Sequence, residues 1–242
     1  MTKTQMRPSL SVNFPLDKFA HDVRQPLRAI MLSAQRMQGL NPAPTPEMLI
    51  FLEQVTTAAR RQDALLTGAV DYDLAINLVE QLEKPMLLSL VIEAACQQVE
   101  PFRKLHNGTL KVSETPPFYA PPLLAKALEK LLHNALKFYL AGYEPVVQVE
   151  VSGDQVGGIV IRVTDTGIGI AEKYRESVFS PLTRLHGPDG YGGPGFGLSI
   201  CRALIESIHG TVVFENSGGP CGVSAVVRLP STVADQVVAT SV

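Results

Sequence analysis

Apolar residues recur at helical spacing along the first part of the chain. From Leu16 they fall on one side of a helix, with polar residues on the other, until about Leu40. The apolar positions of this stretch are Leu16, Phe19, Ala20, Val23, Leu27, Ile30, Met31 and Ala34. Alternate prolines in 41–46 then end the pattern, because proline cannot occupy a helix interior. A second helical stripe runs from Met48 to Val70.

These two stripes predict long antiparallel helices, joined by a short turn, over residues 16–80. A single helical hairpin leaves much of its apolar stripe in water, and a second hairpin of the same kind would cover it. We therefore expect a homodimer in which two hairpins form a four-helix bundle. Residues 1–15 carry no such period and form a lead-in.

After Lys84-Pro85 the pattern changes to a mixture of helices and strands. Helices are expected over 87–98, after Pro121-Pro122 and over 196–208, and strands over 109–112, 147–151, 159–164, 211–214 and 223–229. The Gly- and Pro-rich stretch 171–196 shows only short helical pieces, and loops of this length are usually functional. The fold class is therefore multidomain α and α+β, with a helical hairpin (16–83), an α/β-sandwich domain (84–231) and a tail (232–242).

The composition indicates which partners and which cell compartment to expect. The net charge of -2 gives no bulk attraction for nucleic acid or for an anionic membrane. No apolar run approaches the roughly 18 residues that span a bilayer, so membrane insertion is not expected. Cys96, Cys201 and Cys221 are too far apart for a zinc site, and their odd number favours a reducing compartment. We expect a cytoplasmic protein whose sensor is a separate protein or domain.

One expected helix carries a polar face opposite its leucine stripe. Lys130, Asn134 and Lys137 stand at positions i, i+4 and i+7, and therefore on one side of this helix. An amide oxygen is a suitable ligand for Mg²⁺, and a lysine suits a phosphate. A plain solvated helix face would show the same pattern, so this block alone leaves both interpretations open.

Two glycine-containing blocks point to the same kind of ligand. Asp-Thr-Gly-Ile-Gly at 165–169 follows a strand, where a carboxylate can accept a hydrogen bond from the adenine amine and glycines let the backbone approach the ring. Gly-Gly-Pro-Gly-Phe-Gly-Leu-Ser at 192–199 enters a helix, whose first N–H groups can bind a phosphate. Taken singly, the first block is also typical of a tight turn and the second of a flexible loop.

The hairpin carries a histidine beside a carboxylate. His21 and Asp22 lie on the polar side of the first helix, and Pro26 follows about one turn later, where it would bend the helix and loosen the turn around His21. By itself this pair is more typical of an ordinary surface histidine than of a reactive one.

In this order along the chain, the four blocks resemble the motifs of the histidine kinase family, which has a Bergerat-type ATP-binding fold. The resemblance covers about residues 16–230 and begins with an H box of the phytochrome-like kind at 19–27. Leu-Leu-His-Asn-Ala-Leu-Lys-Phe at 131–138 resembles the N box, and Val-Thr-Asp-Thr-Gly-Ile-Gly-Ile at 163–170 resembles the first glycine box. Val-Phe-Ser-Pro-Leu-Thr-Arg-Leu at 178–185 resembles the F-box region, and 193–198 the second glycine box.

The resemblance implies a two-component histidine kinase that uses ATP and Mg²⁺. His21 would attack the γ-phosphate of ATP through Nε2, and Asp22 would accept the ring proton. Gln25 stands where many members carry the residue that positions water for receiver dephosphorylation. The phosphoryl group would pass to an aspartate on the receiver domain of a response regulator, docked on the hairpin near His21.

The resemblance also assigns the nucleotide site. Asn134 would hold Mg²⁺, and Lys137 would approach the phosphates. Lys130, which stands where the family usually has Asn, could bind phosphate or weaken metal binding. An acid and two glycines would bind the adenine, and the glycine-rich block would close over the phosphates. These residues are Asp165, Gly167, Gly169, Gly193, Gly195, Gly197 and Leu198.

Four departures from the family pattern bear on activity, and the first is Gln25 in place of the usual Thr or Asn, although Gln can still hold a water. Lys130 stands where the family usually has Asn, Pro194 replaces a Thr and lacks its N–H, and no acid precedes the N-box helix around 120–122. One alternative is therefore a non-catalytic phosphotransfer or adaptor dimer that relays phosphate through His21. An ATP-driven clamp of the gyrase type would need Glu at position 130, and Glu129 lies about 100° round the helix. A scaffold with a vestigial pocket is the remaining alternative.

Overall fold

The computed structural model describes residues 16–39, 44–77, 84–155, 157–185, 193–219 and 221–230. The chain divides into two compact units, one ending at Val70 and the other beginning at Asp71. The predicted lead-in (1–15) and tail (232–242) lie outside the described residues. The domain boundary predicted between residues 83 and 84 stays a prediction.

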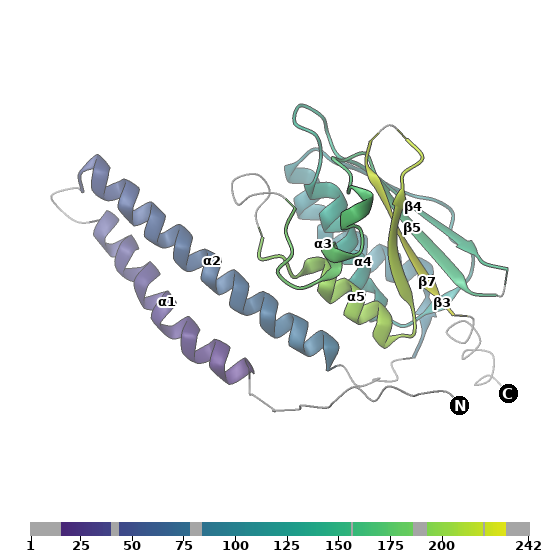
Figure 1. Cartoon of the computed structure of the whole chain (residues 1–242), viewed down its shortest axis with the longest axis horizontal. Helices are drawn as coiled ribbons and strands as arrows, with labels where there is room; N and C mark the ends of the chain where they lie inside the picture. The colour runs from purple at the N-terminus through teal and green to yellow at the C-terminus, as the bar shows by residue number, and fades with distance from the viewer. Residues whose placement is uncertain are drawn as a thin grey trace. The chain divides into compact units, whose positions relative to one another are not determined.

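Two long antiparallel helices form the hairpin, as the sequence predicts. Helix α1 (Leu16–Gln38) and helix α2 (Pro46–Ile76) run side by side in opposite directions (Figure 1). Buried side chains recur every seven residues along α1, and two of those on α2 are also seven residues apart, which is typical of a coiled-coil seam. The buried side chains are Ala20, Leu27 and Ala34 on α1 and Leu52, Ala59 and Ala75 on α2. Because most of them are alanines, the seam lets the helices approach closely but buries little apolar area.

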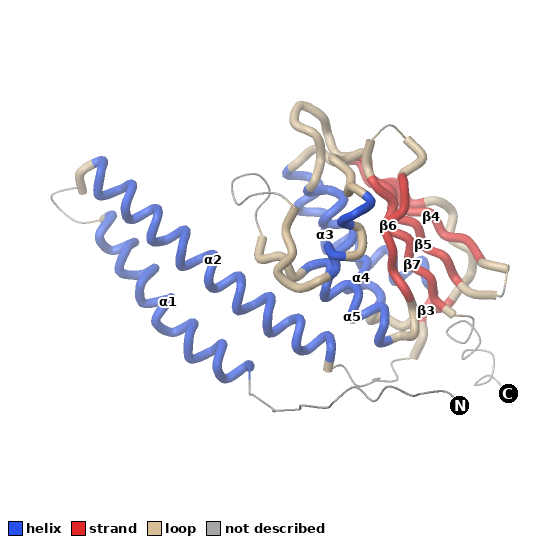
Figure 2. Tube along the Cα trace, in the orientation of Figure 1, coloured by secondary structure: helices blue, strands red, loops and turns tan. Residues whose placement is uncertain are grey.

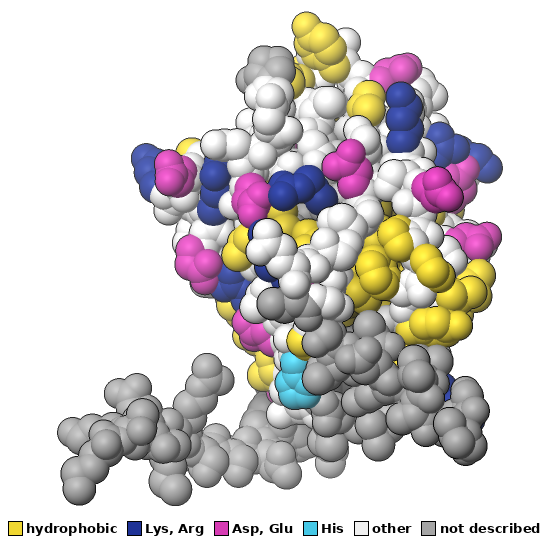
Figure 3. Space-filling model, turned by 90° about the vertical axis from the view of Figure 1, so that its right-hand side faces the viewer, with side chains coloured by type: hydrophobic (Ala, Val, Ile, Leu, Met, Phe, Trp, Pro, Cys, Tyr) yellow, Lys and Arg dark blue, Asp and Glu magenta, His cyan; other side chains and the backbone are white. Residues whose placement is uncertain are grey.

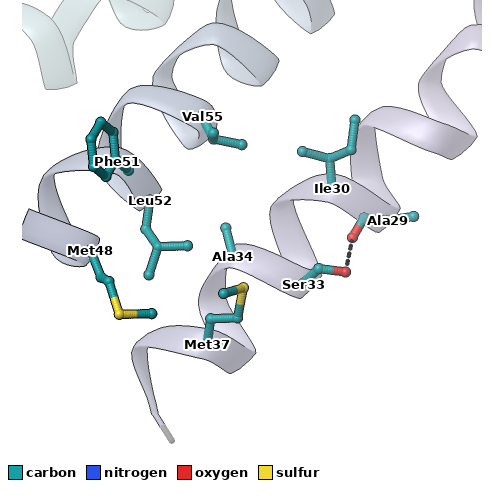
Figure 4. A pocket seen from close by; sticks show the side chains of 9 residues that line it. All are labelled: Ala29, Ile30, Ser33, Ala34, Met37, Met48, Phe51, Leu52 and Val55. Atoms are coloured by element: carbon teal, nitrogen blue, oxygen red, sulfur yellow. Dashed lines mark hydrogen bonds between the residues drawn. The ribbon is translucent and has the colours of Figure 1, made fainter. Parts of the chain in front are cut away.

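An apolar groove opens between the C-terminal part of α1 and the N-terminal part of α2. Its volume is about 590 Å³, and side chains from both helices point toward it (Figure 4). The lining residues are Ala29, Ile30, Ser33, Ala34, Met37, Met48, Phe51, Leu52 and Val55. Phe51 is 64% exposed and Ile30 is 44% exposed, so the isolated hairpin leaves large apolar side chains in water.

The second unit is built on a five-stranded sheet with the order β2-β4-β5-β7-β6. The strands are β2 (Thr109–Val112), β4 (Val146–Gly153), β5 (Ile159–Asp165), β6 (Thr211–Asn216) and β7 (Val223–Leu229). β2 and β4 pair in parallel, and the other neighbours pair antiparallel. These five strands were all predicted. A separate pair, β1 (Met86–Leu87) with β3 (Tyr119–Ala120), was not, because two residues are too short to show a period.

Three helices cover one face of this sheet (Figures 1 and 2). They are α3 (Leu88–Leu105), α4 (Leu124–Lys137) and α5 (Gly197–Ser207), and α4 packs against both of the others. The predicted end of α3 at residue 98 was wrong. The helix continues through Pro101 because the apolar stripe reaches the buried Val99, and one proline removes a single backbone hydrogen bond.

The long loop before α5 is anchored on the sheet. It contains two single-turn helices, η1 (Glu172–Tyr174) and η2 (Ser177–Phe179), in agreement with the short helical pieces predicted there. The buried ring of Phe179 stacks on Phe214 of β6, with 5.1 Å between ring centroids. Residues 186–192 of this loop lie outside the described residues.

The surface of the sheet that faces away from the helices is mixed in character. On β4, the exposed Gln148 and Glu150 alternate with the buried Val147 and Val149. Figure 3 views the molecule from the side on which the sheet lies in Figure 1, and it shows acidic and basic side chains spread over much of this side and a group of hydrophobic side chains at the lower right. Among the helices of the described segments, none combines the length and apolar character that a membrane crossing requires.

Candidate functional site

The predicted phosphate acceptor lies on the hairpin. His21 and Asp22 are exposed on α1, and His21 Nδ1 is 3.6 Å from Asp22 Oδ1. Because Nδ1 faces the carboxylate, Nε2 is the ring nitrogen that a phosphoryl donor can approach. Gln25 is exposed about one turn further along the same helix.

Pro26 weakens the backbone of this turn. α1 continues through Pro26, but proline has no N–H to donate to the carbonyl group of Asp22, four residues earlier. The turn that follows His21 is therefore one backbone hydrogen bond short, which is the physical basis for the loosening predicted from the sequence.

In the second unit, α4 presents leucines to the core and polar side chains along one edge. Leu128 and Leu132 are buried, with 1% of their surface exposed. Lys130, Asn134 and Lys137 are half-buried, at the i, i+4 and i+7 positions noted in the sequence. The helix thus contributes to the core and to a polar edge at the same time.

The charges along this edge are not equivalent. Lys130 Nζ is 3.2 Å from Glu129 Oε1, so its ammonium group already has an ion-pair partner. Burial lowers the pKa of Lys137, and the positive charge of Arg184 lowers that pKa further. Arg184 comes from the long loop, and sequence reasoning did not single it out. The available signal was that it is the one basic residue of the segment 178–185.

Asp165 is the last residue of β5, and two backbone groups hold its carboxylate. Oδ1 accepts hydrogen bonds from the N–H groups of Gly167 at 2.8 Å and Val223 at 3.3 Å. Burial raises the pKa of Asp165 to about 6, and these two hydrogen bonds act in the opposite direction. The carboxylate is therefore fixed in orientation and only partly surrounded by water.

The turn after β5 docks on the end of α4. Ile168 N–H donates a hydrogen bond to the carbonyl oxygen of Phe138 at 3.0 Å. A Cβ atom added to Gly167 would lie 2.1 Å from the same oxygen, so no larger residue fits. Main-chain contact thus joins the polar edge of α4 to the turn that follows Asp165.

Sequence reasoning missed a glycine on the other side of this turn. Gly222 has a φ of +86°, and a Cβ atom there would lie 1.8 Å from the carbonyl oxygen of Asp165. Gly169, with a φ of +73°, faces the carbonyl oxygen of Gly222. In the sequence, Gly222 shows only that a turn precedes the last strand, which any hairpin would show.

The glycine-rich block lies against the polar edge of α4. A Cβ atom on Gly193 would lie 3.0 Å from Lys137 Nζ, and one on Gly197 would lie 3.9 Å from Asn134 Nδ2. α5 begins at Gly197 without a side-chain hydrogen bond to cap it. Its first backbone N–H groups are therefore left for another acceptor, of which a phosphate is a common one.

The long loop meets the glycine-rich block through its backbone. A Cβ atom on Gly195 would lie 3.0 Å from the carbonyl carbon of Leu182. Leu182 itself has a φ of 63°, a left-handed conformation that is costly for leucine and is often found in functional loops. Leu198 lies half-buried in the first turn of α5 and has no polar group to offer a ligand.

The predicted site residues therefore form two groups. Those on α4, in the Asp165 turn and in the glycine-rich block come together within the second unit. His21, Asp22 and Gln25 form a separate group on the hairpin.

Comparison with known proteins fits this arrangement. Residues 119–233 match the family described as histidine kinase-, DNA gyrase B- and HSP90-like ATPase. The adaptive-response sensory kinase SasA of Gloeothece citriformis is 27% identical over 214 residues, which are 84% of this chain and 53% of that protein. The sensor histidine kinase AruS of Pseudomonas aeruginosa is 30% identical over 229 residues, which are 84% of this chain and 21% of that protein.

The fold is also that of solved histidine kinases. The crystal structure of full-length ShkA in complex with AMPPNP matches 89% of this chain and 45% of its own, with a TM-score of 0.66 and 20% identity. This chain spans about half of the length of the first curated relatives that it matches. Residues 119–233 therefore belong to the histidine kinase-, DNA gyrase B- and HSP90-like ATPase family, and the relatives named above, which match most of this chain, are sensory histidine kinases.

Proposed function

We propose that this chain phosphorylates its own His21 with ATP and passes the phosphoryl group to an aspartate on the receiver domain of a response regulator. The observation that carries the proposal is the meeting of three blocks in one unit: the polar edge of α4, the Asp165 turn and the glycine-rich start of α5. Together they offer an oriented acid, cations and helix-start N–H groups, which are the groups that bind an adenine nucleotide.

Asp165 is the residue that we assign to the adenine. Its carboxylate is held by two backbone donors and can accept a hydrogen bond from the exocyclic amine of adenine. Guanine carries a carbonyl oxygen in place of that amine, and two acceptors facing each other would repel. The site should therefore prefer ATP to GTP.

The polar edge of α4 and the long loop are assigned to the phosphates. Lys137 and Arg184 supply positive charge, and the uncapped start of α5 supplies N–H donors. Asn134 fits Mg²⁺, because an amide oxygen on this edge suits a metal that takes its remaining ligands from phosphates and water. Mg²⁺ would neutralise part of the charge on the transferring phosphoryl group.

Transfer to His21 is a displacement at phosphorus. The lone pair of Nε2 forms a bond to the γ-phosphorus, the bond from that phosphorus to the β–γ bridging oxygen breaks, and ADP leaves. Asp22, which faces Nδ1, accepts the ring proton. In the second step a carboxylate oxygen of the receiver attacks the phosphorus, the P–N bond breaks, and the ring regains its proton. We assign to Gln25 the orientation of water when the receiver is dephosphorylated.

We also propose that two copies of the hairpin pair through the apolar groove to form a homodimeric four-helix bundle. The alanine-rich seam buries little area within one hairpin, and Ile30 and Phe51 stay largely exposed. Pairing would remove these side chains from water. In this proposal the chain acts in the cytoplasm and receives its input from a separate sensor protein or domain.

A phosphate relay that does not use ATP is the second candidate function. The ion pair between Lys130 and Glu129 lies one helical turn from Asn134, and Pro194 has no N–H to offer a phosphate. Both features weaken the nucleotide site without affecting His21. The relay would keep the hairpin and its receiver partner and lose only the transfer from ATP.

Replacing Phe51 with Glu should convert the dimer into a monomer, because pairing would bury a charge. Light scattering on the purified chain measures the mass directly. Thr57→Glu places the same charge at an exposed position on another side of α2 and should leave the dimer intact. A Phe51→Glu chain that keeps the mass of a dimer would contradict pairing through this groove.

Incubation with γ-labelled ATP and Mg²⁺ should place an acid-labile, base-stable label on the chain, as expected of phosphohistidine. His21→Gln should remove the label completely. His209→Asn is the matched control, because His209 is exposed in the other unit and asparagine tolerates its φ of 59°.

Label that persists in His21→Gln would rule out His21 as the acceptor. No label on the unmodified chain, together with no nucleotide binding, would favour the relay. If Lys130→Asn takes up the label where the unmodified chain does not, Lys130 is the residue that prevents phosphorylation by ATP.

Asp165→Asn should weaken ADP binding by about 10-fold to 100-fold, because an amide in place of the carboxylate loses a charged hydrogen bond. Binding to the unmodified chain should also weaken as the pH falls through about 6, where Asp165 takes up a proton. Titration calorimetry at several pH values measures both effects. Equal affinity in Asp165→Asn would rule out the adenine role.

The same substitution should stabilise the nucleotide-free chain at neutral pH. The pKa of Asp165 rises from 3.8 to about 6 on folding, so the folded state binds the proton more tightly than the unfolded state. The free energy of unfolding therefore falls as the pH rises from about 4 to about 6, by about 3 kcal/mol. Urea unfolding at several pH values measures this fall in stability, which should be absent in Asp165→Asn. The control Glu150→Gln, at an exposed position on β4, should show the same fall as the unmodified chain.

A further inference from the structure

Arg24 links the two helices of the hairpin beside His21. Its Nε is 3.3 Å from Asp63 Oδ1, and its Nη2 donates a hydrogen bond to Thr67 Oγ1 at 2.9 Å. Thr67 Oγ1 in turn donates to the backbone oxygen of Asp63 at 2.9 Å. We call the contacts of Arg24 with Asp63 and Thr67 the Arg24 clamp.

The Arg24 clamp acts on the turn of α1 that is weakest. Arg24 lies between Asp22 and Pro26, the two residues whose backbone hydrogen bond is missing. The buried apolar side chains nearest to this turn on α1 are Ala20 and Leu27, and the first of these is small. The Arg24 clamp adds a polar link to α2 at the turn that follows His21.

His21 and Arg24 are neighbours on the helix surface. They are three positions apart, a spacing that places two side chains on the same side of a helix about 5 to 6 Å apart. Arginine and a phosphohistidine are both long enough to meet across that distance. A group added to His21 therefore lies within reach of the guanidinium.

We propose that the Arg24 clamp opens when His21 carries a phosphoryl group, and that phosphorylation thereby loosens α1 from α2 around His21. This inference rests on the proposed role of His21 as phosphate acceptor. The phosphoryl group brings up to two negative charges and three acceptor oxygens next to Arg24. Arg24 then turns from Asp63 and Thr67 to the phosphoryl oxygens.

Competition between the two sets of partners favours the phosphoryl group. The side chains of Arg24 and Asp63 are 28% and 47% exposed, and ion pairs in contact with water contribute little to stability. A guanidinium can bind a phosphoryl group through two parallel hydrogen bonds, which are charge-assisted and strong. Opening the clamp would let a receiver domain distinguish the phosphorylated hairpin from the unphosphorylated one.

The test uses phosphoramidate, which phosphorylates histidine without ATP. Its phosphoryl group passes to the histidine nitrogen, its own P–N bond breaks, and ammonia leaves. Hydrogen exchange of the full chain is then compared before and after treatment, with the extent of phosphorylation followed by intact mass. Backbone exchange in the peptide 60–70 of α2 should rise several-fold on phosphorylation, because Asp63 and Thr67 lose their contact with α1.

Variants separate the clamp from other effects of the added charge. Asp63→Asn and Thr67→Val remove one partner each, so both should show raised exchange before treatment and little further change after it. His21→Gln should show no response. Arg28→Gln, which removes an exposed arginine of α1 one turn further from His21, should respond like the unmodified chain.

Unchanged exchange in the phosphorylated chain would overturn the inference. So would a response of full size in both Asp63→Asn and Thr67→Val, since neither retains an intact clamp. Because phosphoramidate bypasses the nucleotide site, a chain that takes no label from ATP but responds here would contradict the kinase proposal and leave the clamp standing. A chain that takes up label from ATP, but whose hydrogen exchange does not change on phosphorylation, would support the kinase proposal and contradict the clamp.

Discussion

The carbonyl oxygen of Phe138, at the end of α4, joins the parts of the nucleotide site. It accepts the N–H of Ile168, and the absence of a side chain on Gly167 lets the two segments meet. Through this contact the helix that carries Asn134 and Lys137 is fixed relative to the carboxylate of Asp165. Any Cβ at position 167 would push the turn away from α4 and separate the proposed adenine contact from the proposed phosphate contacts.

The two units of the chain differ in how much apolar surface their helices bury. In the second unit, fully buried leucines of α4 lie in the core of the layer over the sheet, so the polar edge of the same helix is held rigidly. In the hairpin, alanines dominate the seam, Pro26 removes a backbone bond, and a surface ion pair at Arg24 supports the turn beside His21. Under the proposed function, a rigid site would hold the nucleotide and a more loosely packed helix turn would carry the phosphate acceptor.

Much of this arrangement could be predicted from the sequence, because it depends on periodicity and local chemistry. The long helices, the five main strands, and the shared edge of Asn134 and Lys137 all follow from spacing. The end of α3 was missed because the burial that carries the helix through Pro101 to Leu105 is a tertiary effect. Gly222 and Arg184 were missed for a similar reason, since their importance comes from what lies opposite them in space. The roles assigned to the site residues and the domain boundary at 83/84 stay predictions.

The most direct test of the account is the binding of nucleotides to the unmodified chain, measured by titration calorimetry in the presence of Mg²⁺. If the Asp165 turn, the polar edge of α4 and the start of α5 form an adenine-nucleotide site, ADP should bind saturably, with one molecule per chain. GDP should bind more weakly by about tenfold or more, because its carbonyl oxygen would face the carboxylate of Asp165. Equal affinity for the two nucleotides, or no binding of either, would contradict the account.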